Sequence, residues 1–149
     1  MRTHLHTRIS SMKSLLIVIG LAIAVVGCES GEQFVTREAG LWNVTTQNVK
    51  SYQDSVLVSD VTQTTDLGTM EFLMNGSGYR TVAAVRDTFV WELSAEDDRL
   101  IVYYKIGPFM NSEIQARSDN GMTLFWEYES AIGTTRYKTA KTATFQRAQ

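Results

Sequence analysis

Cysteine, histidine and proline are scarce in this chain of 149 residues, which contains one cysteine, two histidines and one proline. Because Cys28 is the only cysteine, no disulfide can form within the chain. Both histidines, His4 and His6, precede Cys28, so the rest of the chain cannot build a Ser-His-Asp or Cys-His pair or a zinc site with histidine ligands. What stays open is carboxylate, lysine or tyrosine chemistry, an oxygen-ligated metal, or no catalysis. We expect no enzyme and no cofactor.

The first 27 residues have the pattern of a secretory signal. Arg2, Arg8 and Lys13 give a basic start, and an almost unbroken apolar run follows over residues 14–26. At about 1.5 Å per residue, this run forms a helix of roughly 20 Å, which is short of the hydrocarbon core of about 30 Å. The pattern therefore favours a cleaved signal over a permanent transmembrane anchor.

The end of the apolar run, Val25-Val26-Gly27-Cys28, resembles the lipobox of bacterial lipoprotein signal peptides. The resemblance implies cleavage before Cys28 and lipid attachment to its thiol, usually with acylation of the freed amino group. One acyl chain anchors marginally and two or three anchor firmly, since each buried methylene contributes about 0.8 kcal/mol. We expect a bacterial lipoprotein anchored at the outer membrane, on its periplasmic or cell-surface face. The alternative is an ordinary buried cysteine.

The net charge limits the kinds of partner that the protein can be expected to bind. The chain has 14 basic and 16 acidic residues, and cleavage before Cys28 removes three basic residues and no acid, which leaves a net charge of −5. An acidic domain is a poor partner for nucleic acid, so the expected contacts are a membrane, through the lipid, and a small hydrophobic ligand. The predicted organisation is a signal peptide over residues 1–27, a lipidated N-terminus and short tether over 28–37, and one domain over 38–149.

The domain reads as all-β, because β-branched and aromatic residues alternate between turn signals and no stretch keeps a helical period. Asn75-Gly76-Ser77-Gly78 and Asp119-Asn120-Gly121 are the clearest hairpin turns. The nine expected strands cover residues 41–49, 55–64, 70–74, 79–85, 89–93, 100–106, 113–117, 122–128 and 136–146.

Tight turns between successive strands predict an antiparallel up-and-down barrel of about eight strands, which leaves no exposed sheet edge. A period of two assigns one face of each strand to the interior. The inward residues are expected to be Trp42, Val44, Met70, Phe72, Phe89, Trp91, Leu93, Leu100, Val102, Tyr104, Leu124, Trp126, Ala143 and Phe145.

Gly40-Leu41-Trp42 at the head of the first strand matches the Gly-x-Trp opening of lipocalins. With the strands that follow and a closing strand that ends in Phe145-Gln146-Arg147, the pattern resembles the lipocalin-like domains of bacterial lipoproteins over most of residues 38–147. The resemblance implies that Trp42 closes the barrel floor and that a basic residue of the last strand, Arg147 or Lys141, packs over it. The long first loop and C-terminal helix of lipocalins are not visible, which indicates a calycin-like relative.

An eight-stranded barrel is either filled by side chains or holds one small ligand. If it is hollow, aromatic residues are the candidate ligand-binding side chains: Trp42, Phe72, Trp91, Tyr104 and Trp126. Tyr103 is a further candidate pocket residue. Four methionines suit either an adaptable pocket or core gaps; they are Met70, Met74, Met110 and Met122.

The charged residues are weaker candidates for a binding or catalytic site. Arg80, Arg86, Arg99 and Arg117 lie near strand ends, where a barrel mouth can bind an anionic group, although such arginines usually serve solubility.

Two acidic clusters also have ordinary structural explanations. Glu127 and Glu129 form a carboxylate pair that alternation places in water, and Glu96-Asp97-Asp98 reads as a turn, since it lacks the ligand spacing of an EF-hand. No residue is therefore assigned to catalysis or to a metal.

Two functions fit these patterns. The first is a lipid-anchored barrel that binds a small apolar or amphiphilic ligand in the cell envelope. The second is a protein-interaction module with a filled barrel, either a subunit of an envelope complex or an inhibitor of a hydrolase.

Overall fold

The computed structural model describes residues 30–105 and 109–148, apart from the side chains of residues 38 and 39. The expected signal peptide and Cys28, the expected site of lipid attachment, lie outside the described residues. Within these residues no helix is long and apolar enough to cross a bilayer. The strands are β1 Leu41–Gln53, β2 Val56–Gln63, β3 Thr69–Phe72, β4 Ser77–Val82, β5 Val85–Leu93, β6 Arg99–Tyr104, β7 Met110–Ser118, β8 Gly121–Ile132 and β9 Thr135–Arg147.

The strands confirm the all-β prediction and the meander order. Eight of them, β1 and β3 to β9, follow one another in antiparallel pairs, and β9 pairs with β1 to close the barrel. This arrangement is compatible with a lipocalin-like fold. The ninth strand, β2, stands outside the closed set, because its hydrogen-bonded neighbour is the outer part of β1 alone.

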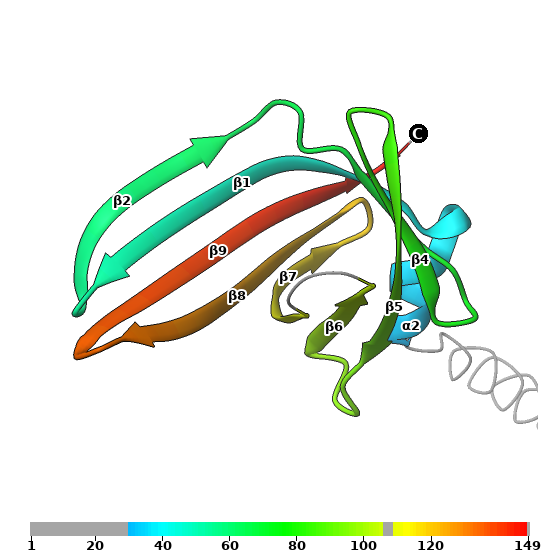
Figure 1. Ribbon diagram of the computed structural model, residues 1–149. Helices are drawn as coiled ribbons and strands as arrows, with labels where there is room; N and C mark the ends of the chain where they lie inside the picture. Colours follow the sequence, from blue (N-terminus) through cyan, green and yellow to red (C-terminus); the bar gives the residue numbers. More distant parts are fainter. Residues whose placement is uncertain (1–29, 106–108, 149) are drawn as a thin grey trace, which may run out of the picture.

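A curved sheet extends beyond the barrel rim (Figure 1). Near its start β1 pairs with β3 over Leu41–Asn43, and beyond that point β2 takes the place of β3 over Gln47–Gln53. The outer parts of β8 and β9 continue beside β1 as far as the pair Ile132 and Thr135. The outer parts of β2 and β8 are exposed on both faces, so their sequences do not alternate cleanly between apolar and polar residues. Strands β1 and β8 are longer than predicted.

The floor of the barrel is covered by a short helix, α2 Gly31–Thr36, which continues into the 3-10 helix η1 Arg37–Gly40. Ser30 caps α2 through a capping box with Gln33. Phe34 and Val35 are buried beneath the barrel. The segment from residue 30 to 37 is thus packed against the domain, whereas the sequence suggested a tether over 28–37.

Trp42 and Arg147 join the floor to the barrel. Trp42 is fully buried, and its Nε1 donates to the carbonyl oxygen of Val35 at 2.9 Å. The Arg147 guanidinium lies 4.3 Å from the centre of the Trp42 ring and donates to the carbonyl oxygens of Phe34 at 2.6 Å, Arg37 at 2.8 Å and Asp119 at 3.0 Å. Of the two basic residues expected to cover the tryptophan, Arg147 does so.

Gly40 explains the glycine of the Gly-x-Trp opening. It has a φ of +64°, and a Cβ at this position would collide with the carbonyl oxygen of Phe72. A side chain would therefore meet both the left-handed backbone conformation and the neighbouring strand. Glycine lets η1 turn into β1 directly against β3.

Core side chains fill the lower barrel, which is the part next to the floor formed by α2 and η1. All fourteen side chains expected to face inward belong to the core cluster or pack against it. The buried hydrophobic residues lie between Phe34 and Phe145, so a chain that begins at residue 30 contains the whole described core. We expect residues 30–149 to fold independently.

Replacing Arg147 by methionine is expected to lower the free energy of unfolding by about 3 kcal/mol, because three carbonyl groups at the floor lose a charged donor. Urea denaturation of residues 30–149 measures the change. Arg136→Met is the matched control, since Arg136 lies exposed on the same strand. A loss for Arg147→Met as small as that of the control would contradict the role given to this residue.

Candidate functional site

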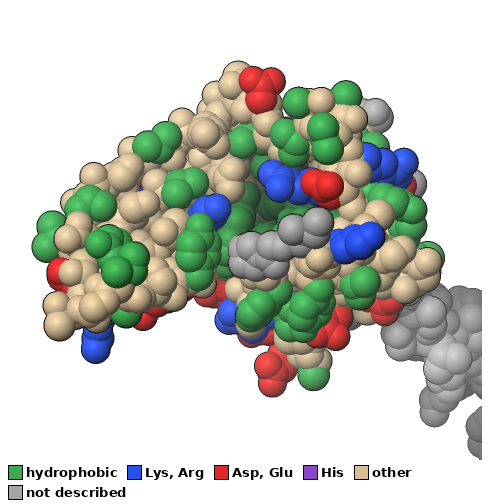
Figure 2. Space-filling model, viewed as in Figure 1, with side chains coloured by type: hydrophobic (Ala, Val, Ile, Leu, Met, Phe, Trp, Pro, Cys, Tyr) green, Lys and Arg blue, Asp and Glu red, His purple; other side chains and the backbone are tan. Residues whose placement is uncertain are grey.

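A cavity of about 670 Å³ opens at the barrel end opposite α2, between the barrel rim and the curved extension. The space-filling view shows a hollow on this face, with basic side chains beside it (Figure 2). Its size falls within the range of about 300 to 1,000 Å³ typical of small-molecule sites. The upper barrel is therefore hollow, although the lower barrel is filled.

The inner wall of the cavity is apolar. Met70 of β3, Met110 of β7, and Ala143 and Phe145 of β9 line it and are buried. Each lies on an inward-facing position of its strand, and the flexible methionines border the open space. Of the four methionines considered from sequence, Met70 and Met110 thus reach the cavity, while Met122 is buried in the core and Met74 is exposed.

The five predicted ligand-binding aromatics separate into two groups. Tyr104 and Trp126 line the cavity. Trp42, Phe72 and Trp91 lie in the closed core.

Contacts within the core hold Phe72 and Trp91 in place. The Phe72 ring lies 5.3 Å from that of Phe89 and 5.6 Å from that of Trp91. The Nε1 of Trp91 donates to the carbonyl oxygens of Leu73 at 3.1 Å and Ser77 at 2.9 Å. Sequence alternation places all five predicted aromatics inside the barrel but cannot say at which depth the filled core ends.

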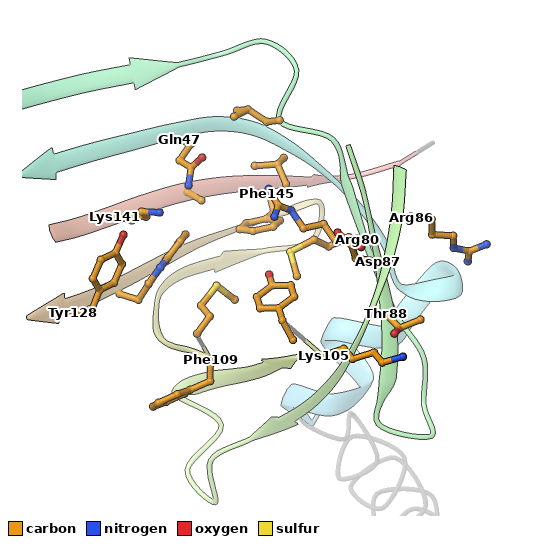
Figure 3. A pocket seen from close by; sticks show the side chains of 17 residues that line it. Gln47, Arg80, Arg86, Asp87, Thr88, Lys105, Phe109, Tyr128, Lys141 and Phe145 are labelled. Carbon is orange, nitrogen blue, oxygen red and sulfur yellow. The ribbon is translucent and has the colours of Figure 1, made fainter. Parts of the chain in front are cut away.

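Two of the four arginines considered from sequence, Arg80 and Arg86, border the cavity, and of these Arg80 points into it (Figure 3). Arg80 shares the inner face of β4 with Gly78 and pairs in register with the buried Met70. Arg86, one strand away, points outward, where it forms an ion pair with Glu71 at 2.8 Å.

The other two arginines lie elsewhere. The Arg99 Nε donates to Asn111 on the outer surface at 2.8 Å. The Arg117 guanidinium lies 5.7 Å from the ring of Phe34 at the floor.

Tyr104 stands between charges at the cavity wall. Burial raises the pKa of its hydroxyl, the Arg80 charge lowers that pKa, and the Asp87 charge raises it, in decreasing order of effect. The net direction is upward from 10.0, so the hydroxyl stays protonated and can both donate and accept a hydrogen bond at neutral pH.

The cavity lining includes residues that were not predicted as site residues, among them Lys141, Gln47 and Tyr128. Lys141 points inward from β9, and its ammonium lies 5.5 Å from the centre of the Tyr128 ring. Lys141 faces Val49 of β1 and Trp126 of β8 in register. Its inward parity could be read from Ala143 and Phe145, but its place at the rim depends on the register between β1 and β9.

The acidic clusters lie away from the cavity. Glu127 and Glu129 are exposed, and Glu127 forms an ion pair with Lys138 at 2.6 Å. In the turn between β5 and β6, Asp97 accepts a hydrogen bond from the backbone of Gly31 at 2.7 Å, which ties the turn to the start of α2. Within residues 30–105 and 109–148, no group of three potential metal-binding side chains comes together.

Comparison with models of known protein families and with curated proteins finds no match.

Tyr104→Phe is expected to remove a phenol that ionises later than usual, which spectrophotometric titration above pH 9 detects as a smaller change in absorbance at the alkaline end. Because the folded pKa is raised, ionisation of Tyr104 costs stability as the pH rises above about 10. The variant is therefore expected to lose less stability in that range than the wild type.

Glu92→Gln serves as the control for this titration. The pKa of Tyr103 is also raised, first by its hydrogen bond to Glu92. The control should shift the titration of Tyr103 downward and leave that of Tyr104 in place. An unchanged alkaline end in Tyr104→Phe would contradict the environment described here for Tyr104.

Proposed function

We propose that this protein is a lipocalin-like carrier, anchored to a membrane by lipid on Cys28, that binds a small apolar or amphiphilic molecule without chemical change. The observation that carries the proposal is the open cavity of about 670 Å³ above a filled core. A barrel that served only as a scaffold would gain stability from side chains in this space, since buried apolar contacts favour folding.

The lining supports an amphiphilic ligand in particular. Buried apolar side chains, among them Met110 and Phe145, form the inner wall, while Arg80, Lys141 and Tyr128 stand toward the rim. A molecule with an apolar tail and a polar head would bury the tail and keep its head near water. The methionines can adapt to tails of different shape.

The position of the floor supports the orientation of such a carrier. Ser30 begins the described chain beside α2, at the end of the barrel opposite the β1–β2 and β8–β9 hairpins (Figure 1). A lipid anchor two residues before Ser30 would hold the floor near the bilayer. The cavity would then face away from the anchoring membrane.

Calorimetric titration of residues 30–149 with straight-chain alcohols of eight to twelve carbons tests the proposal. We expect saturable binding that strengthens up to about fourfold with each added methylene, the factor that corresponds to about 0.8 kcal/mol. Mass spectrometry of lipids that co-purify with the full chain complements the titration.

Gln47→Trp fills the rim and is expected to weaken binding of the longest alcohol, because Gln47 lines the cavity. Asn48→Trp places the same ring on the opposite face of β1, where Asn48 bonds to Asp60 and Thr62, and should not weaken binding. Absence of saturable binding by any alcohol in the folded wild type would contradict the proposed function.

A second candidate, a protein-interaction module, is favoured by β2. All eight of its residues are exposed, including Val56, Leu57, Val58 and Val61, and one edge of the strand pairs with no other described strand. Natural proteins usually protect such an edge with lysine, proline or a covering element. Crosslinking in cells followed by capture of the full chain tests this candidate: a stoichiometric partner lost from Val61→Lys supports it, and no such partner contradicts it.

A further inference from the structure

The cavity has a charge opposite to that of the domain around it. Its lining contains one acidic residue, Asp87, and four basic residues, Arg80, Arg86, Lys105 and Lys141. Of the basic residues, Arg80 and Lys141 point into the cavity, whereas Arg86 points outward and is paired with Glu71. The part of the chain that follows Cys28 has a net charge of −5. Positive charge is therefore concentrated at the cavity although acidic residues predominate elsewhere, and a low-dielectric wall strengthens the field of such a cluster.

Arg80 is placed to meet a ligand. It stands on the inner face of β4, with its side chain directed over the cavity. Within the described residues the guanidinium takes part in no hydrogen bond or ion pair, even though Asp87 is its partner in register on β5. Its planar set of donors thus stays available to an acceptor that enters from solvent.

Lys141 reaches the cavity from the other wall. It projects from β9, and Figure 3 shows it on the side of the cavity away from Arg80. Its ammonium lies 5.5 Å from the centre of the Tyr128 ring. It makes no hydrogen bond or ion pair within the part of the chain that the structure describes, so its three donors can bind an oxygen. The two cations flank the opening, and apolar Met70 and Met110 lie deeper.

We infer that the ligand is an anionic amphiphile with a single carboxylate-like charge, bound with its acid group between Arg80 and Lys141 and its apolar tail on the buried methionines and Phe145. The inference rests on the proposed function. The Tyr104 hydroxyl, which stays protonated, adds a neutral donor near Arg80.

Asp87 limits the charge that the site accepts. It lies opposite Arg80 in register, and its charge acts on Tyr104 together with that of Arg80. A ligand with one negative charge gains from two cations and meets one carboxylate. A second negative charge on the same head would be repelled by Asp87 without a further inward cation to offset it.

The test compares ligands with one tail and different heads. Residues 30–149 are titrated by calorimetry at pH 8 with dodecanoic acid, dodecanol, dodecylamine and dodecyl phosphate. Dodecanoic acid is expected to bind about tenfold more tightly than dodecanol, the scale of one charge-assisted hydrogen bond at a partly exposed site, and dodecylamine more weakly than both. Dodecyl phosphate, which is dianionic at this pH, is expected to bind more weakly than dodecanoic acid.

Substitutions test which side chains bind the charged head of the ligand. Arg80→Gln and Lys141→Gln should each weaken dodecanoic acid about three- to tenfold and change dodecanol by less than twofold, because they remove charge from the head and not from the tail. Lys138→Gln removes a lysine from the outer face of the same strand, and Arg99→Gln removes an outward arginine. These two controls should alter neither affinity, and urea unfolding checks that all four variants fold.

The outcomes separate the two levels of the proposal. Saturable binding of dodecanol as tight as that of dodecanoic acid would overturn the anionic head while leaving the carrier function in place. Binding of none of the four ligands would overturn the carrier function itself. Tighter binding of dodecyl phosphate than of dodecanoic acid would overturn the limit of one charge.

Discussion

The contact between the Arg147 guanidinium and the Trp42 ring closes the floor of the barrel, and it thereby determines which end of the barrel stays open. At 4.3 Å from the ring, the guanidinium also donates to carbonyl groups of α2, η1 and the turn between β7 and β8, so it ties the two ends of the described chain together at the floor. Arg147 is 6% exposed, and its charge is tolerated there because these acceptors and the ring face satisfy it. With the floor closed in this way, the cavity opens at the opposite end.

Depth along the barrel then separates the filled core from the cavity. Near the floor, Trp42, Phe72 and Trp91 are buried and pack edge to face or donate to backbone carbonyl oxygens. Toward the rim, the same inward faces present Tyr104 and Trp126 to the cavity. One pattern of alternation therefore forms both the filled core and the cavity wall. The change from a filled to a hollow interior occurs along individual strands, since Leu100 of β6 is fully buried whereas Tyr104 of the same strand lines the cavity.

The inward faces of β1, β3, β5, β6, β8 and β9 were predictable because each of these strands has one apolar side, which a period of two reveals. The inner face of β4 was not predictable in this way, because it carries Gly78 and Arg80. The floor helix was missed because its first residues are polar, although Ser30 and Gln33 carry the spacing of a capping box that could have found it. Lys141 and Arg147 could not be told apart, since they share a face of the last strand. The register with β1 distinguishes them. Arg147 lies opposite Trp42 at the floor, whereas Lys141 lies opposite Val49 toward the rim.

A crystal structure of residues 30–149 with dodecanoic acid brominated at its terminal carbon would show how a ligand lies in the cavity, because anomalous scattering locates the end of the tail. We expect a bromine peak beside Met70 and Met110, with the carboxylate within hydrogen-bond distance of Arg80 or Lys141. A bromine peak at the rim with the acid group inside, or a cavity occupied by water alone at saturating ligand, would contradict this expectation.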